Sequence, residues 1–292
     1  KKALLIYMDQ FSNLQQITAL TKQTQEQLPV RLFLTTNPGL EKIVRHELIS
    51  RLAQQNESAK KIEINPFGIS GQLWIESTNY TTLYSTALKL RSINDVFLPL
   101  NLFSLPNIGA IDHIENMCAQ LNVKSMETAK SFRVTCRRVG EHTFNSIDVQ
   151  RRAGAALWRR YRTTVDLKNF EIDIRIYIYK ANCLISLPLT TKALSNRLGR
   201  VFQPRTAIRS SVAYALLHFA RIDSTSKSSL LDPFCGSGTI LFEAADYSKK
   251  LILYGSDINQ HVIIGAQKNA QALGFEQRIS FTQCDARELN QI

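Results

Sequence analysis

The residues best suited to chemistry are the eight from Asp232 to Thr239, which read Asp-Pro-Phe-Cys-Gly-Ser-Gly-Thr. They follow a short apolar run at residues 228–231 and precede a helical pattern over residues 239–247. Gly236 and Gly238 allow a tight turn and a close approach of a ligand to the main chain. The free N–H groups of the following helix favour an electronegative or anionic group. We therefore predict a ligand-binding loop here.

Two acidic residues follow this loop at informative positions. Apolar runs at residues 251–255 and 279–282 lead into Asp257 and Asp285, and a helical pattern over residues 260–273 lies between them. Strands, helices and acids in this order predict a nucleoside-binding α/β half-sheet. Asp257, about 20 residues past the loop, would accept hydrogen bonds from both ribose hydroxyls, and Asp285 would reach the adenine edge. The loop lacks the third glycine of a dinucleotide site and the lysine of a P-loop.

The composition limits the class of protein. A chain of 292 residues with 44% hydrophobic residues can bury two or three cores, and it contains no apolar run of 18 residues that would predict a membrane span. Its five cysteines are scattered without a CxxC pair, and no histidines lie at metal-ligand spacing. We expect a cytoplasmic protein with no membrane association, no disulfide and no metal.

The net charge of +12 is unevenly distributed. Residues 110–222 carry 19 basic and 8 acidic side chains, whereas residues 223–292 carry 6 basic and 8 acidic ones. A basic surface of this kind neutralises phosphates and releases their counterions, which gives affinity for nucleic acid. The middle of the chain is therefore predicted to bind a polyanion, with a solvated basic face as the alternative.

The first part of the chain predicts a small α+β domain. We expect a strand at residues 3–8 and a helix at 14–28. A clearer series of elements follows, with a strand at 31–35, a helix at 37–51, strands at 61–65 and 71–76, and a helix at 80–90. That order is consistent with a ferredoxin-like unit. Residues 98–109 contain proline and asparagine and are predicted to be a connector.

The middle part alternates between helical and strand patterns. We expect helices at residues 110–121, 147–161 and 208–219, and strands at 130–138, 173–179 and 183–187. The strand at 130–138 places Phe132, Val134 and Cys136 on one face and basic residues on the other. Residues 190–209 hold five basic side chains and no acid.

Several of these positions resemble a THUMP domain, a module known for binding RNA. The resemblance rests on Phe132-Arg133-Val134, Arg137-Arg138, Ser146 with the helix start at 148–154, Val165-Asp166-Leu167, and the strand DIRIYIY at 173–179. Together with DPFCGSGTILFEAA, the chain resembles the THUMP-containing class I S-adenosylmethionine-dependent methyltransferases that make N2-methylguanosine in tRNA or 23S rRNA. The resemblance covers roughly residues 31–285 and is sharpest from Leu231 to Ala245.

This resemblance implies a domain order and a set of cofactor contacts. We expect a ferredoxin-like domain at residues 1–109, a THUMP domain at 110–190, a linker with a leading helix at 191–222, and the first half of a Rossmann-like methyltransferase domain at 223–292. The loop would line the methionine and sulfonium end of S-adenosylmethionine, Asp257 would hold the ribose, and the next strand ends would frame the adenine. The predicted cofactor-binding residues are Asp232, Pro233, Phe234, Cys235, Gly236, Ser237, Gly238, Thr239, Asp257, Ile258, Asp285 and Ala286.

The resemblance also implies contacts with RNA, which are assigned to arginines. The predicted RNA-binding residues are Arg133, Arg137, Arg138, Arg151, Arg152, Arg159, Arg160, Arg197 and Arg200. For each of them, an ordinary surface role is the alternative.

One feature of the resembling family is missing. Its members carry Asn/Asp-Pro-Pro-Tyr/Phe after the fourth strand, which holds the target amino group and stacks on the flipped base, and no proline follows Pro233. A three-stranded parallel sheet would also leave an apolar strand at its edge. We expect the polypeptide to continue past Ile292; the alternative is a partner chain that completes the sheet. No catalytic residue is assigned within residues 1–292.

The resulting prediction is methylation of the exocyclic N2 of guanine in structured RNA, with tRNA favoured over rRNA. Methylation of 23S rRNA at guanine N2 and methylation of adenine N6 remain alternatives within enzymes. A non-catalytic RNA-binding relative that needs a partner chain is the alternative outside them.

Overall fold

The computed structural model describes residues 30–225 and 227–288, which form two compact units. Of these residues, the first unit contains 30–34, 56–84 and 95–191, and the second contains 35–55, 85–94, 192–225 and 227–288. The strand expected at 3–8 and the helix expected at 14–28 lie outside the described residues.

An eight-stranded sheet forms the centre of the first unit, with the strand order β2-β3-β1-β4-β8-β7-β5-β6. Its strands are β1 (Val30–Thr35), β2 (Lys61–Ile64), β3 (Gln72–Ser77), β4 (Asp95–Ser104), β5 (Ser131–Val139), β6 (Thr164–Val165), β7 (Ile172–Tyr179) and β8 (Asn182–Pro188). The helices in this part of the chain are α3 (Tyr80–Ala87), α4 (Ala110–Gln120), the 3-10 helix η1 (Lys124–Glu127) and α5 (Ser146–Tyr161).

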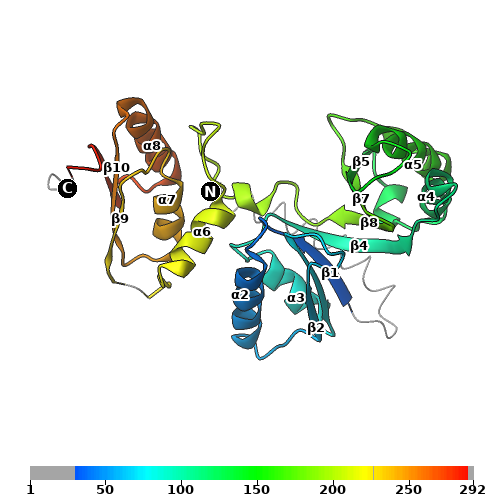
Figure 1. Cartoon of the computed structure of the whole chain (residues 1–292), viewed down its shortest axis with the longest axis horizontal. Coiled ribbons are helices and arrows are strands. Elements are labelled where there is room, and N and C mark those ends of the chain that lie inside the picture. Colours follow the sequence, from blue (N-terminus) through cyan, green and yellow to red (C-terminus); the bar gives the residue numbers. More distant parts are fainter. Residues whose placement is uncertain (1–29, 226, 289–292) are drawn as a thin grey trace. The chain divides into compact units, whose positions relative to one another are not determined.

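Strand β5, next to the edge strand β6, is built from the alternating pattern recognised in the sequence. Phe132 and Val134 on β5 are buried, and they share a core with apolar residues of α4, α5, β7 and β8. Figure 1 shows α4 and α5 on one side of β5, β7 and β8. Helix α5 begins at a capping box, in which Asn145 accepts the N–H of Asp148 and Asp148 accepts the N–H of Asn145. Strand period and helix cap thus agree with the predicted elements.

The connector predicted at residues 98–109 is wrong for most of its length. Residues up to Ser104 belong to β4, which pairs antiparallel with β8 from Phe97 to Ser104. The pairing register shifts between Pro99 and Asn101, and a proline is tolerated in a strand at such an irregularity. Pro99, which predicted a loop, therefore lies within strand β4 of the eight-stranded sheet.

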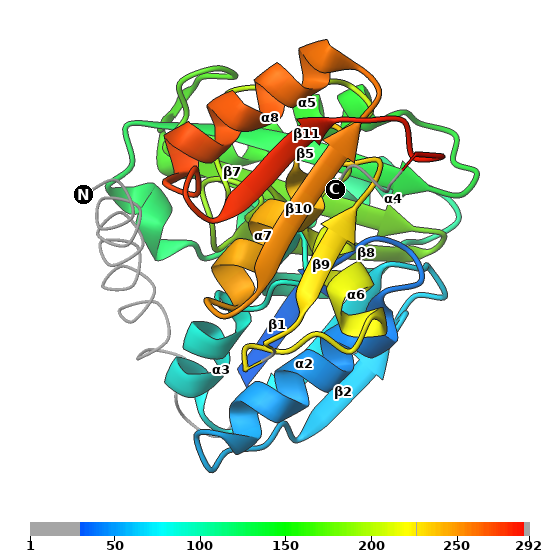
Figure 2. The same ribbon diagram turned by 90° about the vertical axis from the view of Figure 1, so that its left-hand side faces the viewer.

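The second unit holds a parallel sheet in the order β11-β10-β9. Its elements are α2 (Glu41–Ala53), the 3-10 helix η2 (Leu194–Asn196), α6 (Ser210–Phe219), β9 (Ser229–Asp232), α7 (Thr239–Tyr247), β10 (Ile252–Asp257), α8 (Gln260–Leu273) and β11 (Ile279–Gln283). Figure 2 shows β9, β10 and β11 side by side, and Figure 1 shows α7 and α8 on one side of them. The bounds of α7 and α8 are those predicted from the sequence.

Close packing fixes this sheet against its helices. A Cβ added at Gly255 of β10 would lie 2.5 Å from a methyl carbon of Leu241 on α7 and 3.0 Å from the ring of Phe281 on β11. A glycine is therefore needed where strand and helix approach each other. Leu253 on β10 and Phe242 on α7 are buried in the same core. This packing holds the start of α7 at the end of β9.

No helix among the described residues is long and apolar enough to span a bilayer. All five cysteines are free thiols and buried. In the part of the chain that the structure describes, no three His, Cys, Asp or Glu side chains group as metal ligands.

Candidate functional site

The predicted acids meet at one edge of the parallel sheet. Asp232 ends β9 and Asp257 ends β10, and the two strands run parallel with Gly255 opposite Asp232. On the other side of β10, Asp257 is opposite Gln283, two residues before Asp285. Ligands of open α/β sheets bind outside the carboxyl ends of the strands. The three acids therefore border one candidate site.

Asp257 fastens the glycine loop to the second strand. Its Oδ2 accepts the backbone N–H of Gly236 at 3.0 Å, and its Oδ1 accepts the N–H of Asn259 at 3.0 Å. The N–H of Cys235 donates to the carbonyl oxygen of Ser256 at 2.8 Å. The carboxylate predicted to lie beside the turn is thus in contact with it. Each carboxylate oxygen has a second lone pair with which it can accept another hydrogen bond.

The loop has a backbone geometry that depends on glycine, with open space beside Gly236. Gly236 and Gly238 adopt φ values of +51° and +85°, a region that favours glycine. A Cβ at Gly238 would lie 2.7 Å from the Phe242 ring, whereas a Cβ at Gly236 would meet nothing within 4 Å. Gly238 is also the N-cap of α7 and supplies no side chain to the first N–H groups of the helix. The loop therefore fits a ligand with polar or anionic groups.

Asp232 and Cys235 are both perturbed by burial. Burial raises the pKa of Asp232, as does the charge of Asp257, while the N–H of Phe234 lowers it by donating to Oδ1 at 3.2 Å. Burial raises the pKa of the Cys235 thiol to about 12, with the charges of Asp232 and Asp257 acting in the same direction. A thiol that stays protonated at neutral pH is a poor nucleophile. These residues shape the loop and do not form a covalent-catalysis pair.

Two apolar side chains are exposed beside the acids. Phe234 is 77% exposed and Ile258 is 64% exposed, and each follows closely on the end of a strand. Large apolar side chains that flank a polar loop provide surfaces on which a planar ring can pack. This placement suits the adenine contact predicted for Ile258. Pro233 and Ala286 are partly buried at the same edge.

Asp285 is already engaged by a neighbour. Arg287 donates to both of its carboxylate oxygens and also through its backbone N–H, which lowers the pKa of Asp285 to about 2. The side chain of Arg287 is largely exposed. A ligand that uses Asp285 would have to share its oxygens with this exposed arginine or displace it.

Two residues at this site were not predicted as cofactor contacts. Arg200, assigned to RNA from the sequence, donates from Nη1 to the hydroxyls of Ser237, at 3.4 Å, and of Thr239. Asn269 of α8 is fully buried and donates to the carbonyl oxygens of Phe202, at 2.7 Å, and of Ser237, at 3.1 Å. Residues 200–202 therefore line the loop. The signal for this contact in the sequence was Asn269 itself, a polar residue among the apolar positions of its helix.

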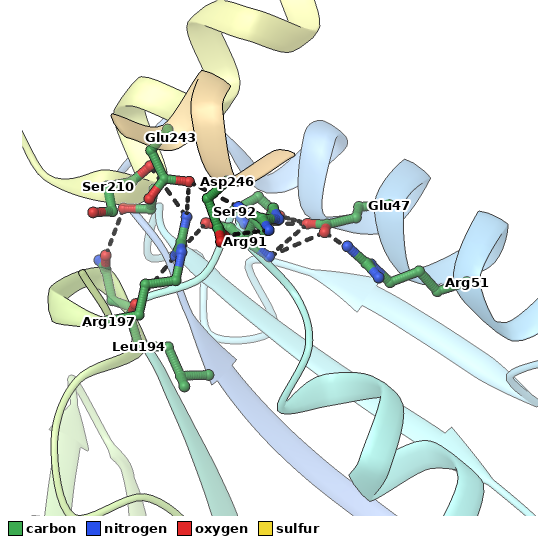
Figure 3. Close-up of polar contacts among 11 residues, drawn as sticks. Glu47, Arg51, Arg91, Ser92, Leu194, Arg197, Ser210, Glu243 and Asp246 are labelled. Atoms are coloured by element: carbon green, nitrogen blue, oxygen red, sulfur yellow. Dashed lines mark hydrogen bonds and ion pairs between the residues drawn. The ribbon is translucent and has the colours of Figure 1, made fainter. Parts of the chain in front are cut away.

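A buried network supports the other end of α7. Glu243 is fully buried, and its Oε2 accepts from Arg197 Nη2 at 2.6 Å and from Arg91 Nη1 at 3.3 Å (Figure 3). Arg91 also pairs with Asp246 at 2.6 Å. Glu47 accepts the backbone N–H groups of Arg91 and Ser92, as Figure 3 also shows. Arg197, also predicted to contact RNA, thus anchors the helix that begins at the glycine loop.

In the first unit, five of the predicted RNA-binding arginines are engaged in internal contacts. Arg133 pairs with the buried Asp173 at 2.9 Å and lies 3.7 Å from the centroid of the Phe170 ring. Arg152 and Arg159 of α5 both pair with Glu115 of α4. The remaining two are Arg138, which contacts His142 at 2.8 Å, and Arg160, which donates to the carbonyl oxygen of Ala119 at 3.1 Å.

The other two arginines of that group are more available. Arg137 is exposed, and its side chain forms no hydrogen bond or ion pair with any described residue. Arg151 is 76% exposed, and its contact is an ion pair with Asp148 at 3.3 Å, one helical turn away. Exposed ion pairs of this kind contribute little, so the guanidinium can be recruited by a phosphate.

Two segments of the chain match models of known protein families. Residues 110–188 match the THUMP domain, and residues 197–292 match the RMKL-like methyltransferase domain. The second match begins at Arg197, so it includes the segment that lines the glycine loop.

Relatives with assigned activities span most of the chain. A tRNA (guanine(6)-N2)-methyltransferase of Thermus thermophilus is 32% identical over 262 residues, covering 87% of this chain and 72% of the relative. The enzyme of that name from Archaeoglobus fulgidus is 27% identical over 303 residues, covering 91% and 72%. The crystal structure of TrmN from Thermus thermophilus superimposes with a TM-score of 0.74 at 31% identity, covering 90% of this chain and 75% of that one.

Proposed function

This chain belongs to the family of THUMP-domain S-adenosylmethionine-dependent RNA methyltransferases, and we propose from that premise that it methylates the N2 amine of guanosine 6 in tRNA. The observation that carries the proposal is the contact between Asp257 and the backbone of Gly236, which joins the glycine loop to an acidic strand end. The two tRNA (guanine(6)-N2)-methyltransferase relatives supply the nucleotide and the RNA class.

The residues of the loop fit the proposed cofactor. Asp257 has free lone pairs for the ribose hydroxyls, and Ile258 offers an exposed apolar surface for the adenine. The open backbone at Gly236 lets the amino-acid end approach the main chain. When bound, S-adenosylmethionine supplies a methyl group activated by a positively charged sulfur.

The contribution of this chain to the reaction is to hold the donor in place. Methylation is an in-line displacement, in which the N2 lone pair forms the new N–C bond, the sulfur–carbon bond breaks, and the nitrogen loses one proton. Correct placement of two reacting groups can account for much of such a rate enhancement. Asp232 orders the turn through the N–H of Phe234, and we assign it no role as a general base.

The THUMP part of the first unit would hold the RNA. A basic region with 19 lysines and arginines between residues 110 and 222 provides affinity that does not depend on base sequence. In this proposal Arg137 and Arg151 contact phosphates, since neither is bonded to another helix or strand of the unit through its side chain. We also propose that the reaction takes place in the cytoplasm, where tRNA is used.

The test is a methyl-transfer assay on paired substrates. Purified protein carrying this chain is incubated with methyl-labelled S-adenosylmethionine and one of two tRNA transcripts, which differ only by G or A at position 6. Digestion to nucleosides should release labelled N2-methylguanosine from the first transcript and no label from the second.

Other outcomes would point to the alternatives. Labelled N6-methyladenosine would contradict the guanine assignment and favour an adenine methyltransferase. Label that is independent of position 6 would reject the proposed tRNA site. RNA binding without any binding of S-adenosylmethionine would favour a non-catalytic protein.

A further inference from the structure

Arg200 occupies an unusual position beside the glycine loop. Its Nη1 donates to the hydroxyls of Ser237 and Thr239, whose residues are both buried, and its Nη2 donates to the carbonyl oxygen of Ile208 at 3.4 Å. Thr239 is the first residue of α7. The guanidinium is therefore held at the helix start by neutral oxygens.

This charge has no carboxylate partner. Arg200 forms no ion pair with any residue between 30 and 288 that the structure describes, whereas nearby Arg197 pairs with Glu243 at 2.6 Å. Burial lowers the pKa of Arg200, and the charge of Glu243 offsets part of that effect. A partly buried cation without a counter-ion is unfavourable.

The neighbouring helix makes the imbalance larger. The N-terminus of a helix carries partial positive charge, and Gly238 provides no side-chain oxygen to cap α7. A second positive group at that point is repelled unless an anion lies between the two. Arginine presents a planar fork of donors that matches a carboxylate.

We propose that Arg200 is the counter-ion of the α-carboxylate on the methionine part of bound S-adenosylmethionine, an assignment that rests on the proposed function. The adenosine end is assigned to Asp257 and Ile258 at the end of β10, so the amino-acid end falls to the start of α7. This role replaces the RNA contact predicted for Arg200 from the sequence.

The local structure keeps Arg200 in this position. Asn269 exchanges two hydrogen bonds with the backbone of Phe202, at 2.8 and 2.7 Å, and also donates to the carbonyl oxygen of Ser237. The segment that carries Arg200 and the loop that it contacts are thereby tied to the same buried side chain. A positioned arginine loses less freedom when it binds its ligand.

The test compares two ligands that differ only in the carboxylate. Calorimetry measures the affinity of S-adenosylmethionine and of decarboxylated S-adenosylmethionine for the wild-type protein, Arg200→Met, Arg200→Lys and the control Arg205→Met. Arg205 is an exposed arginine of the same segment that forms no hydrogen bond with a described residue.

A carboxylate contact gives a specific pattern of affinities. Wild-type protein should bind S-adenosylmethionine about 10- to 100-fold more tightly than the decarboxylated ligand, as expected for a charged hydrogen-bonded pair. Arg200→Met should lose that preference, because the affinity for S-adenosylmethionine falls much more than the affinity for the decarboxylated ligand. Arg200→Lys should keep part of the preference, and Arg205→Met should match the wild type.

Three results would overturn the assignment. Equal losses for both ligands in Arg200→Met would mean that Arg200 only shapes the loop. Unchanged affinities in that variant would mean that it makes no contact with the cofactor. If the wild-type protein binds neither ligand, the proposed function itself fails, and that failure is seen before any variant is compared.

Discussion

At the scale of single residues, one carboxylate is expected to serve both the loop and its ligand. Asp257 accepts the N–H groups of Gly236 and Asn259, which fixes the turn and the start of α8. Its remaining lone pairs lie at the edge where ribose hydroxyls are proposed to bind. Loss of the side chain would therefore affect both loop geometry and ligand contacts.

Asp257→Ala is expected to weaken S-adenosylmethionine binding by about 1–3 kcal/mol, because two hydroxyls and a loop amide lose a charged acceptor. Asp257→Asn, which keeps one acceptor oxygen, should lose less. Calorimetry measures both, with Glu276→Ala at an exposed acid as the control. An affinity of Asp257→Ala equal to that of the control would remove Asp257 from the ribose site.

The sequence identified the loop and Asp257 because a glycine turn and an acid at a strand end leave a local pattern. It did not predict that Asn269 and Arg200 contact the loop, since their partners lie 32 and 39 residues away in the chain. A basic stretch without acids shows charge and does not show which guanidinium faces inward. Hydrogen bonds between residues far apart in the chain leave no periodic pattern in the sequence, unlike the apolar faces of helices and strands.

At the scale of elements, α8 is held by a contact that only glycine permits. A Cβ at Gly265 would lie 2.2 Å from a ring carbon of Phe202. The backbone of Phe202 is fixed by Asn269 of the same helix, so its ring has little room to move away. The helix and residues 200–202 therefore pack as one piece.

Gly265→Ala is expected to destabilise the protein by about 1–3 kcal/mol through overpacking. The matched control is Gly154→Ala in helix α5, where the added carbon meets only a Val134 methyl group at 3.9 Å. That change should be neutral or stabilising by about 0.5–1 kcal/mol, since alanine is the better helix former. Urea unfolding compares the two, and similar midpoints would contradict the packing argument.

Helix α7 contributes two acids to ion pairs with arginines, and these acids differ in exposure: Glu243 is fully buried and Asp246 is partly exposed. Glu243→Gln should destabilise the protein by about 3 kcal/mol, because Arg197 and Arg91 would lose their shared buried carboxylate. Asp246→Asn alters a 44% exposed partner of Arg91 and should cost about 0–1 kcal/mol. The same unfolding experiment tests this pair, and an equal cost at both sites would show that burial does not set the effect.

The sequence predicted elements well where their ends carry signals. Helix α8 begins after Asn259, which caps it through the N–H of His261, and ends at Gly274 in a left-handed conformation. Strand β4 carries no such signal, and its Pro99 indicated a loop. Only the pairing with β8 reveals that strand, and pairing is a property of the folded sheet.

At the scale of the whole molecule, the net charge of +12 overstates the positive charge that is available to RNA. Arg152 and Arg159 are committed to Asp112 and Glu115 of α4, and Arg133 is committed to Asp173. Counting basic residues pointed to a region that includes the span matched by the THUMP domain. It could not show which of those arginines already pair with a carboxylate of a neighbouring helix.

Replacing Arg137 and Arg151 with alanine is expected to weaken tRNA binding and to lower the slope of log affinity against log salt by about 0.9 for each lost phosphate contact. Replacing Arg152 and Arg159 should change that slope less and should loosen the pairing of α4 with α5. Filter binding across salt concentrations measures the slopes, with calorimetry for cofactor binding as the control. Equal slopes for the two double variants would show that ion pairs with α4 do not keep arginines out of the RNA footprint.

The antiparallel pairing of β4 with β8 has a practical consequence for dissecting this protein. A fragment trimmed to residues 110–188, the span matched by the THUMP model, would discard Asp95–Ser104 and leave one side of β8 without a neighbour. Five consecutive residues of β8 are buried. In the fragment β8 would be an unpaired, apolar edge strand, and such strands promote self-association. The THUMP domain is therefore best isolated together with β4. Aggregation of the shorter fragment would result from the loss of β4 and not from a weak hydrophobic core.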